Sequence, residues 1–409
     1  MQKRVPRGEA GATTLIVLMF LVTFLLRMTG NMVQTTIPLF ARGYLGMNEA
    51  GIGTVSAVYT AAGVFAPILI VSRIRITRLS SALIGYSALF TGLVPLFFLV
   101  HDSLDLYILT ASTSIAASTV MPLMLISAQT MNTAYAHRVI GTYTVALSTS
   151  LVFGPLLEGL LATHFGGVGI VFIAFCPFVL AATLLLIAGK WIGERRGNAS
   201  HADDERLRKG GAVLRFEDAA RVWKSRDFIV PALGQLGYSV VFAAILSFGG
   251  ILAENNINAG YGEVFLLFAI FFSSSLAVRI LLTLLPDPRR KVDLIHLAMI
   301  VSMAGLLMIE FSRNDAAMYL AFGILGVPHG LQYPVTTMMI AERMKREDLP
   351  MVNAFFAATG AASMALTPLL IGILSLSYGL TASMAFLVVP VGVLWAAFSA
   401  VSRGWQQRR

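Results

Sequence analysis

The segment Gly154-Pro155-Leu156-Leu157-Glu158-Gly159-Leu160-Leu161 recurs later in the chain as Thr367-Pro368-Leu369-Leu370-Ile371-Gly372-Ile373-Leu374. A shorter fragment, His164-Phe165-Gly166, is matched at the same distance by Ser377-Tyr378-Gly379. Similarity repeated at one offset predicts a fold built from two related halves. The comparison also isolates Glu158, because the second copy has Ile371 at the corresponding position.

The composition predicts a membrane protein. Hydrophobic residues make up 57% of the 409 residues and charged residues only 12%, against roughly 25% charged residues in ordinary soluble domains. Windows of about 20 residues identify twelve apolar segments. These segments are 13–40, 51–71, 79–100, 105–130, 138–163, 168–191, 228–253, 261–285, 292–312, 316–341, 350–374 and 379–401. Their continuous apolar character favours helices over the alternating strands of a β-barrel. We therefore predict an all-α integral membrane protein with twelve transmembrane helices in two pseudo-symmetric six-helix bundles.

Charge and polarity predict the domain boundaries and the orientation. A polar stretch at 193–226 separates an N-terminal bundle, 1–192, from a C-terminal bundle, 227–409. Nearly all of the 30 Lys and Arg residues lie at the two termini, in this stretch and in every second connection between apolar segments. By the positive-inside rule both termini and the 193–226 linker are cytoplasmic. The net charge of +9 follows from this bias, so it indicates contact with anionic headgroups and no nucleic-acid partner.

Several other classes of protein lose support. The first apolar segment is too long for a signal peptide, so we expect it to remain as a helix. Cys176 is the only cysteine, which excludes a disulfide framework and a thiolate metal site. We find no phosphate-binding loop, paired catalytic carboxylates or nucleophile triad. We therefore expect neither an enzyme nor a bound metal or cofactor.

Two related halves in a membrane protein are the organisation of secondary transporters, with the substrate path between the halves. Gly141, Ser150, Gly154-Pro155 and Glu158-Gly159 lie in the predicted helix 138–163. Their spacing resembles the antiporter motif of the major facilitator superfamily, with Ser150 and Glu158 at two positions where that motif has glycine. The resemblance implies the major facilitator fold, alternating access of the two bundles, and export.

A second resemblance concerns the basic loops of that family. Arg279 followed by Asp287-Pro288-Arg289-Arg290-Lys291 is similar to its loop motif between helices 8 and 9. The earlier copy, Ser72-Arg73-Ile74-Arg75-Ile76-Thr77-Arg78, retains basic residues but lacks the acid and the glycine. The resemblance implies a gating or structural role for Arg73, Arg279, Asp287, Arg289 and Arg290, alongside Gly141, Gly154, Pro155 and Gly159. For Arg279 a direct substrate contact is the alternative.

A third resemblance lies in the predicted helix 316–341. The run Gly326-Val327-Pro328-His329-Gly330-Leu331-Gln332-Tyr333-Pro334 is similar to bacterial efflux members of the superfamily related to sugar and drug exporters. In the same helix His329, Gln332 and Tyr333 recur at helical spacing on one face. Gln235 and Tyr238 form a smaller pair in the predicted helix 228–253. We predict that these five side chains bind substrate and that His329 also takes part in proton coupling; a buried histidine with structural partners is the alternative.

A polar stripe marks the first predicted helix. Arg27 lies near its middle, and Asn31, Gln34 and Pro38 follow on the same helical face. Ionisable groups inside a membrane cost several kcal/mol unless they face a wet cavity or a partner. We predict that Arg27, Asn31 and Gln34 bind substrate, since a guanidinium suits a carboxylate or phosphate. The alternative is that Arg27 only tethers neighbouring helices.

Glu158 is the candidate for proton coupling. It follows a Gly-Pro pair, and proline leaves the local backbone short of hydrogen bonds. A carboxyl in apolar surroundings readily takes up and releases a proton near neutral pH. The alternatives are a fixed ion pair or a side chain that reaches the outer interface. The sequence leaves open whether Arg27 reaches Glu158.

These observations predict a monomeric, proton-coupled exporter of a small organic molecule in the cytoplasmic (inner) membrane. Its expected partners are the substrate, protons and the lipid bilayer. A proton-coupled importer of an organic anion is the nearest alternative, motivated by Arg27. A membrane sensor or scaffold without transport activity is the third reading.

Overall fold

The computed structural model describes residues 7–71, 73–74, 78–130, 136–194, 221–284, 290–345 and 348–405. The described residues are almost entirely helical, and none of them forms a strand, which confirms the predicted all-α class. Contacts along the chain define two compact units: Met1–Thr36 with Ala62–Gly211, and Ile37–Ala61 with Ala212–Arg409. These units do not coincide with the two sequence halves, because residues 37–61 belong to the second unit.

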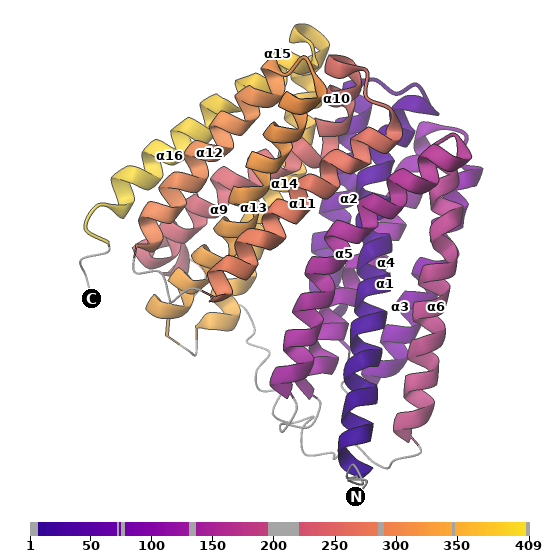
Figure 1. Cartoon of the computed structure of the whole chain (residues 1–409). Helices are drawn as coiled ribbons and strands as arrows, with labels where there is room; N and C mark the ends of the chain where they lie inside the picture. Colours follow the sequence, from indigo (N-terminus) through magenta and orange to yellow (C-terminus); the bar gives the residue numbers. More distant parts are fainter. Residues whose placement is uncertain are drawn as a thin grey trace, which may run out of the picture. The chain divides into compact units, whose positions relative to one another are not determined.

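The first unit contains most of the N-terminal helices (Figure 1). Its elements are α1 (Arg7–Gly43) up to Thr36, α2 (Glu49–Val71) from Ala62, α3 (Leu79–Leu93), the 3₁₀ turn η2 (Val94–Leu99), α4 (Ser103–Thr130), α5 (Ala136–Phe165) and α6 (Gly169–Glu194). α3 packs against α4 and α6, and α5 packs against the same two helices. A buried hydroxyl pair, Ser87 with Thr183 at 2.7 Å, joins α3 to α6. Such pairs hold apolar helices together where burial alone gives little driving force.

The second unit contains the remaining helices. They are α9 (Arg226–Ala244), the π-turn η3 (Ile245–Gly249), α10 (Gly250–Ile257), α11 (Tyr261–Leu284), α12 (Lys291–Phe311), α13 (Asp315–Arg343), α14 (Leu349–Tyr378), α15 (Leu380–Phe386) and α16 (Val388–Ser402). α13 lies between α11 and α12, and α9 packs against α13, α14 and α16. Asn314 caps α13 by accepting a hydrogen bond from the Ala317 amide at 2.9 Å.

Glycines allow a close helix contact in the second unit. Gly326 and Gly330, four residues apart on α13, face α11. A Cβ at Gly326 would overlap the carbonyl oxygen of Phe271, and one at Gly330 would overlap that of Ser275. Small residues at this spacing let two helix backbones approach closely. The same run of sequence carries His329, so this contact also positions a candidate functional residue.

Residues 37–61 pack within the second unit by the same device. A Cβ at Gly53 on α2 would overlap the carbonyl oxygen of Pro368 on α14. On the opposite side of the contact, a Cβ at Gly372 would overlap the carbonyl oxygen of Glu49. The two helices therefore meet backbone to backbone. Gly372 belongs to the repeated segment that also contains Glu158 in its first copy.

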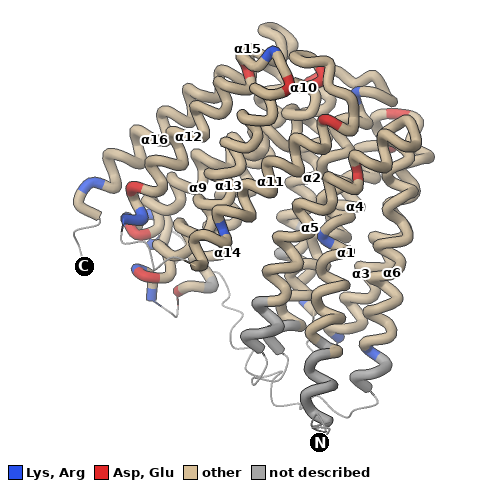
Figure 2. Tube along the Cα trace, viewed as in Figure 1, with Lys and Arg blue, Asp and Glu red and all other residues tan. Residues whose placement is uncertain are grey.

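The described helices fit a membrane. Eleven of them are long and apolar enough to cross it. α13 has the necessary length, but polar residues such as His329 and Gln332 lower its hydropathy. Charged residues gather toward the helix ends in each unit, and the helix middles are largely free of them (Figure 2). Each of the twelve predicted segments coincides with one helix or with two or three consecutive helical elements.

Candidate functional site

A buried carboxyl lies at the contact between α5 and α1 in the first unit. Glu158 is fully buried and accepts hydrogen bonds from two neighbouring hydroxyls of α1. Thr35 Oγ1 lies 2.9 Å from Oε2 and 3.1 Å from Oε1, and Thr36 Oγ1 bonds to Oε1. We name these three residues the Glu158 cluster. Both threonines are as buried as the carboxyl, so the cluster is shielded from solvent.

The Gly-Pro pair brings α5 into position for this contact. Gly154 faces Met28 of α1 closely enough that a Cβ there would lie 3.5 Å from the Met28 carbonyl oxygen. Pro155 contributes no amide hydrogen to α5, which leaves a backbone carbonyl of the preceding turn without its helical partner. One turn beyond this close approach, the Glu158 side chain meets Thr35 and Thr36.

The Glu158 carboxyl forms no ion pair within the described part of the chain. Arg27 is partly exposed, makes no hydrogen bond or ion pair among the described residues, and interacts electrostatically with Tyr143 of α5. The possible Arg27–Glu158 pair is therefore not formed in this structure. Asn31 is 3% exposed and its Nδ2 has no hydrogen-bond partner among the described residues, whereas Gln34 is partly exposed.

A second polar cluster lies in the second unit, where α9, α11 and α13 meet. We name it the His329 cluster after its central residue; the other members are Gln235, Tyr238 and Gln332. Aromatic rings surround the imidazole of His329, which is only 7% exposed. The ring centroids lie 4.4 Å away for Phe242, 5.2 Å for Phe271, 5.5 Å for Tyr238 and 5.6 Å for Phe272.

Several polar atoms of the His329 cluster are buried without a hydrogen-bond partner in the described residues. The Gln332 amide donates to the Gly234 carbonyl, and the Gln235 amide donates to Ser239 Oγ at 3.3 Å. Both glutamine side-chain oxygens, the Tyr238 hydroxyl and both His329 ring nitrogens remain unpaired among those residues. A buried polar group left unpaired costs about 1–3 kcal/mol. Such groups suit the binding of a polar ligand, which would supply the missing partners.

The structure separates Tyr333 from the other predicted residues of α13. Its side chain is 53% exposed, and its ring lies 6.3 Å from that of Phe356 on α14. Arg279 on α11, by contrast, interacts electrostatically with both Tyr238 and His329. The guanidinium charge therefore acts on the His329 cluster, while Tyr333 lies outside it.

The structure describes some, but not all, of the residues that resemble the family's antiporter and loop motifs. Gly154, Pro155 and Gly159 are buried in α5, and Gly141 belongs to the same helix. Asp287 and Arg289 lie outside the described residues. Arg290 is exposed and faces Asp293 at 3.9 Å. The proposed gating roles of these residues stay predictions.

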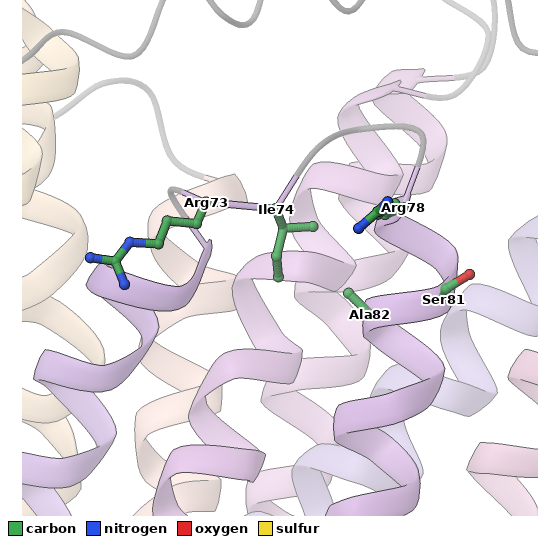
Figure 3. Close-up of a pocket in the computed structure, with 5 residues that line it drawn as sticks. All are labelled: Arg73, Ile74, Arg78, Ser81 and Ala82. Atoms are coloured by element: carbon green, nitrogen blue, oxygen red, sulfur yellow. The ribbon is translucent and has the colours of Figure 1, made fainter.

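Arg73 lies beside a pocket of about 520 Å³ at the connection between α2 and α3. The pocket is lined by Arg73, Ile74, Arg78, Ser81 and Ala82 (Figure 3). In that view the Arg73 side chain extends away from the other four residues. The guanidinium groups of Arg73 and Arg78 do not point toward a common position, so they do not form a shared binding site for an anion. Among the described residues, no group of three or more His, Cys, Asp or Glu could hold a metal ion.

Some residues of the two clusters were not singled out from the sequence. Thr35 and Thr36 directly follow Gln34 in the polar stripe, but threonine is common in membrane helices and gives no specific signal. The aromatic surroundings of His329 come from Phe242, Phe271 and Phe272. Phenylalanines at helical spacing are ordinary core residues, so only the packing of α9 and α11 against α13 identifies them.

The unpaired Tyr238 hydroxyl leads to a prediction. Tyr238→Phe removes a buried polar atom that has no hydrogen-bond partner in the described part of the chain, so we expect the unfolding temperature to stay equal or to rise by a few degrees, equivalent to about 1 kcal/mol. Substrate affinity should fall by about tenfold if the hydroxyl bonds to substrate. Thermal unfolding and ligand-induced shifts of the purified protein measure both effects. A large loss of stability would contradict the unpaired state.

Comparison with known proteins agrees with this fold. The sequence model of the Major Facilitator Superfamily matches residues 19–291. A bacterial homologue of the human lysosomal transporter Spinster, in an inward-facing and unoccupied conformation, is similar with a TM-score of 0.75 and 13% identity, over 97% of this chain and 98% of that one. A mutant of the nucleoside transporter NupG is similar with a TM-score of 0.77 and 11% identity, over 95% of this chain and 99% of that one. A POT family transporter in complex with a thioalcohol-conjugated peptide is similar with a TM-score of 0.74 and 12% identity, over 95% of this chain and 96% of that one. No curated protein sequence matches the chain.

The described helices define a multi-pass membrane protein. The chain belongs to the Major Facilitator Superfamily.

Proposed function

We propose that this protein is a proton-coupled secondary transporter that exports a small organic molecule, with Glu158 as the proton-binding group. The main observation in support of this proposal is that the Glu158 carboxyl is fully buried and that its only hydrogen-bond partners among the described residues are hydroxyls. A permanently charged group in such surroundings is costly unless it is paired. A carboxyl that alternates between charged and neutral forms avoids this cost in one of its states, which is the property required of a coupling site.

The proposed substrate contacts are Arg27, Asn31 and Gln34 from the first unit and the His329 cluster from the second; Tyr333 is retained as an outlying contact. In the His329 cluster the unpaired glutamine oxygens are acceptors, so they favour a substrate with N–H or O–H donors. The surrounding aromatic rings favour a substrate with an apolar or planar part. His329 is proposed to contribute to proton exchange as well, since its two nitrogens are unpaired among the described residues.

Export is supported by the Gly154-Pro155 segment, which resembles the antiporter motif and forms the close contact between α5 and α1. Import of an organic anion is the second candidate, favoured by the guanidinium of Arg27, which has no hydrogen bond or ion pair among the described residues. We further propose a monomer in the cytoplasmic membrane with both termini cytoplasmic, on the strength of the charge distribution.

Two experiments test this proposal in sequence. A thermal-shift screen of the purified protein against metabolites and drugs identifies the substrate, because a ligand stabilises the folded state by RT ln(1 + [L]/Kd). Proteoliposomes with pH gradients of either sign then give the direction. Substrate that moves in the direction opposite to proton flow supports export by antiport. Substrate that moves in the same direction as the protons supports the importer. Transport that ignores both gradients would refute proton coupling.

Arg27 provides a prediction that separates two kinds of contact. If the substrate is attracted by charge alone, Arg27→Lys keeps most of the transport rate and Arg27→Ala loses about tenfold or more. If the substrate needs a planar bidentate contact, both variants lose a similar amount. Transport rates at matched expression decide between the outcomes. Unchanged rates in both variants would show that Arg27 only tethers helices.

A further inference from the structure

We propose that Thr35 and Thr36 transmit the protonation state of Glu158 to the point where α1 passes from the first compact unit into the second. This inference rests on the proposed role of Glu158 in proton coupling and adds a mechanical consequence to it. Three observations support it: where the unit boundary falls, what holds α1 on either side of it, and how many acceptors surround the Thr35 hydroxyl.

The unit boundary falls directly after the Glu158 cluster. α1 is one continuous helix, yet its residues up to Thr36 belong to the first unit and those from Ile37 belong to the second. Pro38 follows at once and contributes no amide hydrogen, so the carbonyl of Gln34 lacks its usual helical partner. Proline is a common cause of kinks within helices. The helix is therefore weakened at the place where it changes unit.

Each side of this point is anchored. Before it, Thr35 and Thr36 hold the Glu158 carboxyl of α5. Beyond it, Arg42 Nη2 donates to Asn255 Oδ1 at 2.7 Å, and its Nε lies 3.9 Å from Glu254. Movement of one unit against the other must therefore be absorbed by α1 near Pro38 and by α2 near Ala61 and Ala62, where that helix also changes unit.

The Thr35 hydroxyl has one proton and several acceptors within reach. Its Oγ1 lies 2.9 Å from the Asn31 carbonyl, 3.1 Å from the Met32 carbonyl and 2.9 Å from Glu158 Oε2. An ionised Glu158 requires the hydroxyl proton to point at the carboxylate. A protonated Glu158 can donate to the threonine oxygen, and the hydroxyl then bonds to a carbonyl of its own helix. The two protonation states thus correspond to different hydrogen bonding in the turn before Pro38.

Threonine hydroxyls that bond to the carbonyl four residues earlier tend to bend helices. Protonation of Glu158 favours this bond at Thr35, and ionisation removes it. The threonine pair therefore converts a change of charge on α5 into a change of geometry in α1. In this role Thr35 and Thr36 are positioning residues, because they act through Glu158 rather than on substrate.

Other charged groups on the surrounding helices do not take the place of Thr35 and Thr36 as partners of the Glu158 carboxyl. The described charged or titratable side chains on or beside the elements around Glu158 are Arg27 and Arg42 on α1, Tyr143 and His164 on α5, Asp102 just before α4, Asp105 and Tyr107 on α4, and Cys176 and Lys190 on α6. Among the described residues, Glu158 forms no ion pair with any of them. Within the described part of the chain, the hydrogen bonds of Glu158 go to Thr35 and Thr36 alone.

The test measures the separation of the two units directly and needs no substrate. In a Cys176→Ser background, spin labels are placed at Ser80→Cys in the first unit and Lys224→Cys in the second, both at exposed positions. Distance distributions by pulsed electron resonance are recorded in liposomes from about pH 5 to pH 9, which spans the range in which a buried carboxyl titrates. We expect the wild-type distribution to change between two populations with a single midpoint.

The variants remove one hydroxyl at a time. Thr36→Val and Thr35→Val keep the side-chain shape without the hydroxyl, and Thr36→Ser restores it. Thr29→Val is the matched control, because Thr29 is equally buried on α1 but, among the residues that the structure describes, bonds only to the Leu25 carbonyl, at 3.0 Å. Hydrogen bonds to a charged group contribute about 1.5–3 kcal/mol. Each valine should therefore move the midpoint to higher pH by about one unit or more. The serine variant and the control should keep the wild-type midpoint.

The outcomes separate this inference from the proposed function. Loss of the transition in Glu158→Gln, with shifted midpoints in the Thr35 and Thr36 valine variants, supports both. Loss in Glu158→Gln with wild-type midpoints in the threonine variants overturns the threonine role and leaves proton coupling intact. A wild-type transition in Glu158→Gln, or no transition in the wild-type protein, refutes both for this conformational change. Size-exclusion profiles confirm folding, and a Thr36→Ser variant that behaves like Thr36→Val would also overturn the inference.

Discussion

Glu158→Gln is expected to abolish substrate accumulation driven by a pH gradient while substrate exchange without a gradient continues. Glutamine keeps the size of the side chain and can still bond to Thr35 and Thr36, but it cannot bind or release a proton. A pH difference of one unit is worth 1.36 kcal/mol per proton, which supports up to about tenfold accumulation for one coupled proton. The variant should show none of this accumulation.

The measurement pairs counterflow without a gradient with uphill transport across one, in the same proteoliposomes. Glu310→Gln is the matched control: Glu310 is 8% exposed, but it lies at the end of α12 in the second unit and takes no part in either polar cluster. The control should accumulate substrate like the wild type. Normal uphill transport by Glu158→Gln would refute the coupling role and leave a structural contact with α1.

The helical architecture could be predicted because the membrane simplifies the problem. Long apolar segments have few alternatives to helices when every backbone group needs an internal hydrogen bond. The same reasoning found α13 by its length, although His329 and Gln332 make it less apolar than the other spans. No pattern in the amino-acid sequence predicted that residues 37–61 pack with the second unit. That arrangement depends on close contacts such as Gly53 with Pro368, which join residues far apart in the chain.

The candidate site was predictable only one helix at a time. Comparison of the repeats singled out Glu158, because packing alone is satisfied by Ile371 in the other copy. Its partners were not predictable, since the sequence does not give the register between two helices. Thr35 lies eight residues beyond Arg27, a distance of about 12 Å along a helix. Glu158 therefore meets the threonines and forms no pair with the arginine.

Tyr333 illustrates a limit of helical spacing. It follows His329 by four residues, which places both on one face of a regular helix. In the structure His329 is enclosed by rings of α9 and α11, whereas Tyr333 is half exposed near Phe356. A shared face inferred from spacing alone therefore does not show which of its side chains a neighbouring helix encloses.

Gly326→Ala and Gly330→Ala are expected to destabilise the protein strongly, whereas Gly323→Ala should leave it equally or more stable. In an open helix, alanine is favoured over glycine by about 1 kcal/mol. At Gly323 the new Cβ would lie 3.6 Å from Ile270 Cγ2, an ordinary contact, so this gain should persist. At Gly326 and Gly330 the Cβ would overlap carbonyl oxygens of α11, and overpacking of this kind costs about 1–3 kcal/mol or more.

The three substitutions are chemically identical and lie on one helix, so the comparison isolates the contact between α11 and α13. Thermal unfolding in detergent should give lower midpoints for Gly326→Ala and Gly330→Ala than for the wild type. Because Phe271 supplies both the overlapped carbonyl and a ring beside His329, these variants should also weaken substrate binding. Gly323→Ala should bind normally. Equal stability of all three variants would mean that the two helices are not held at backbone distance, and the aromatic enclosure of His329 would lose its structural basis.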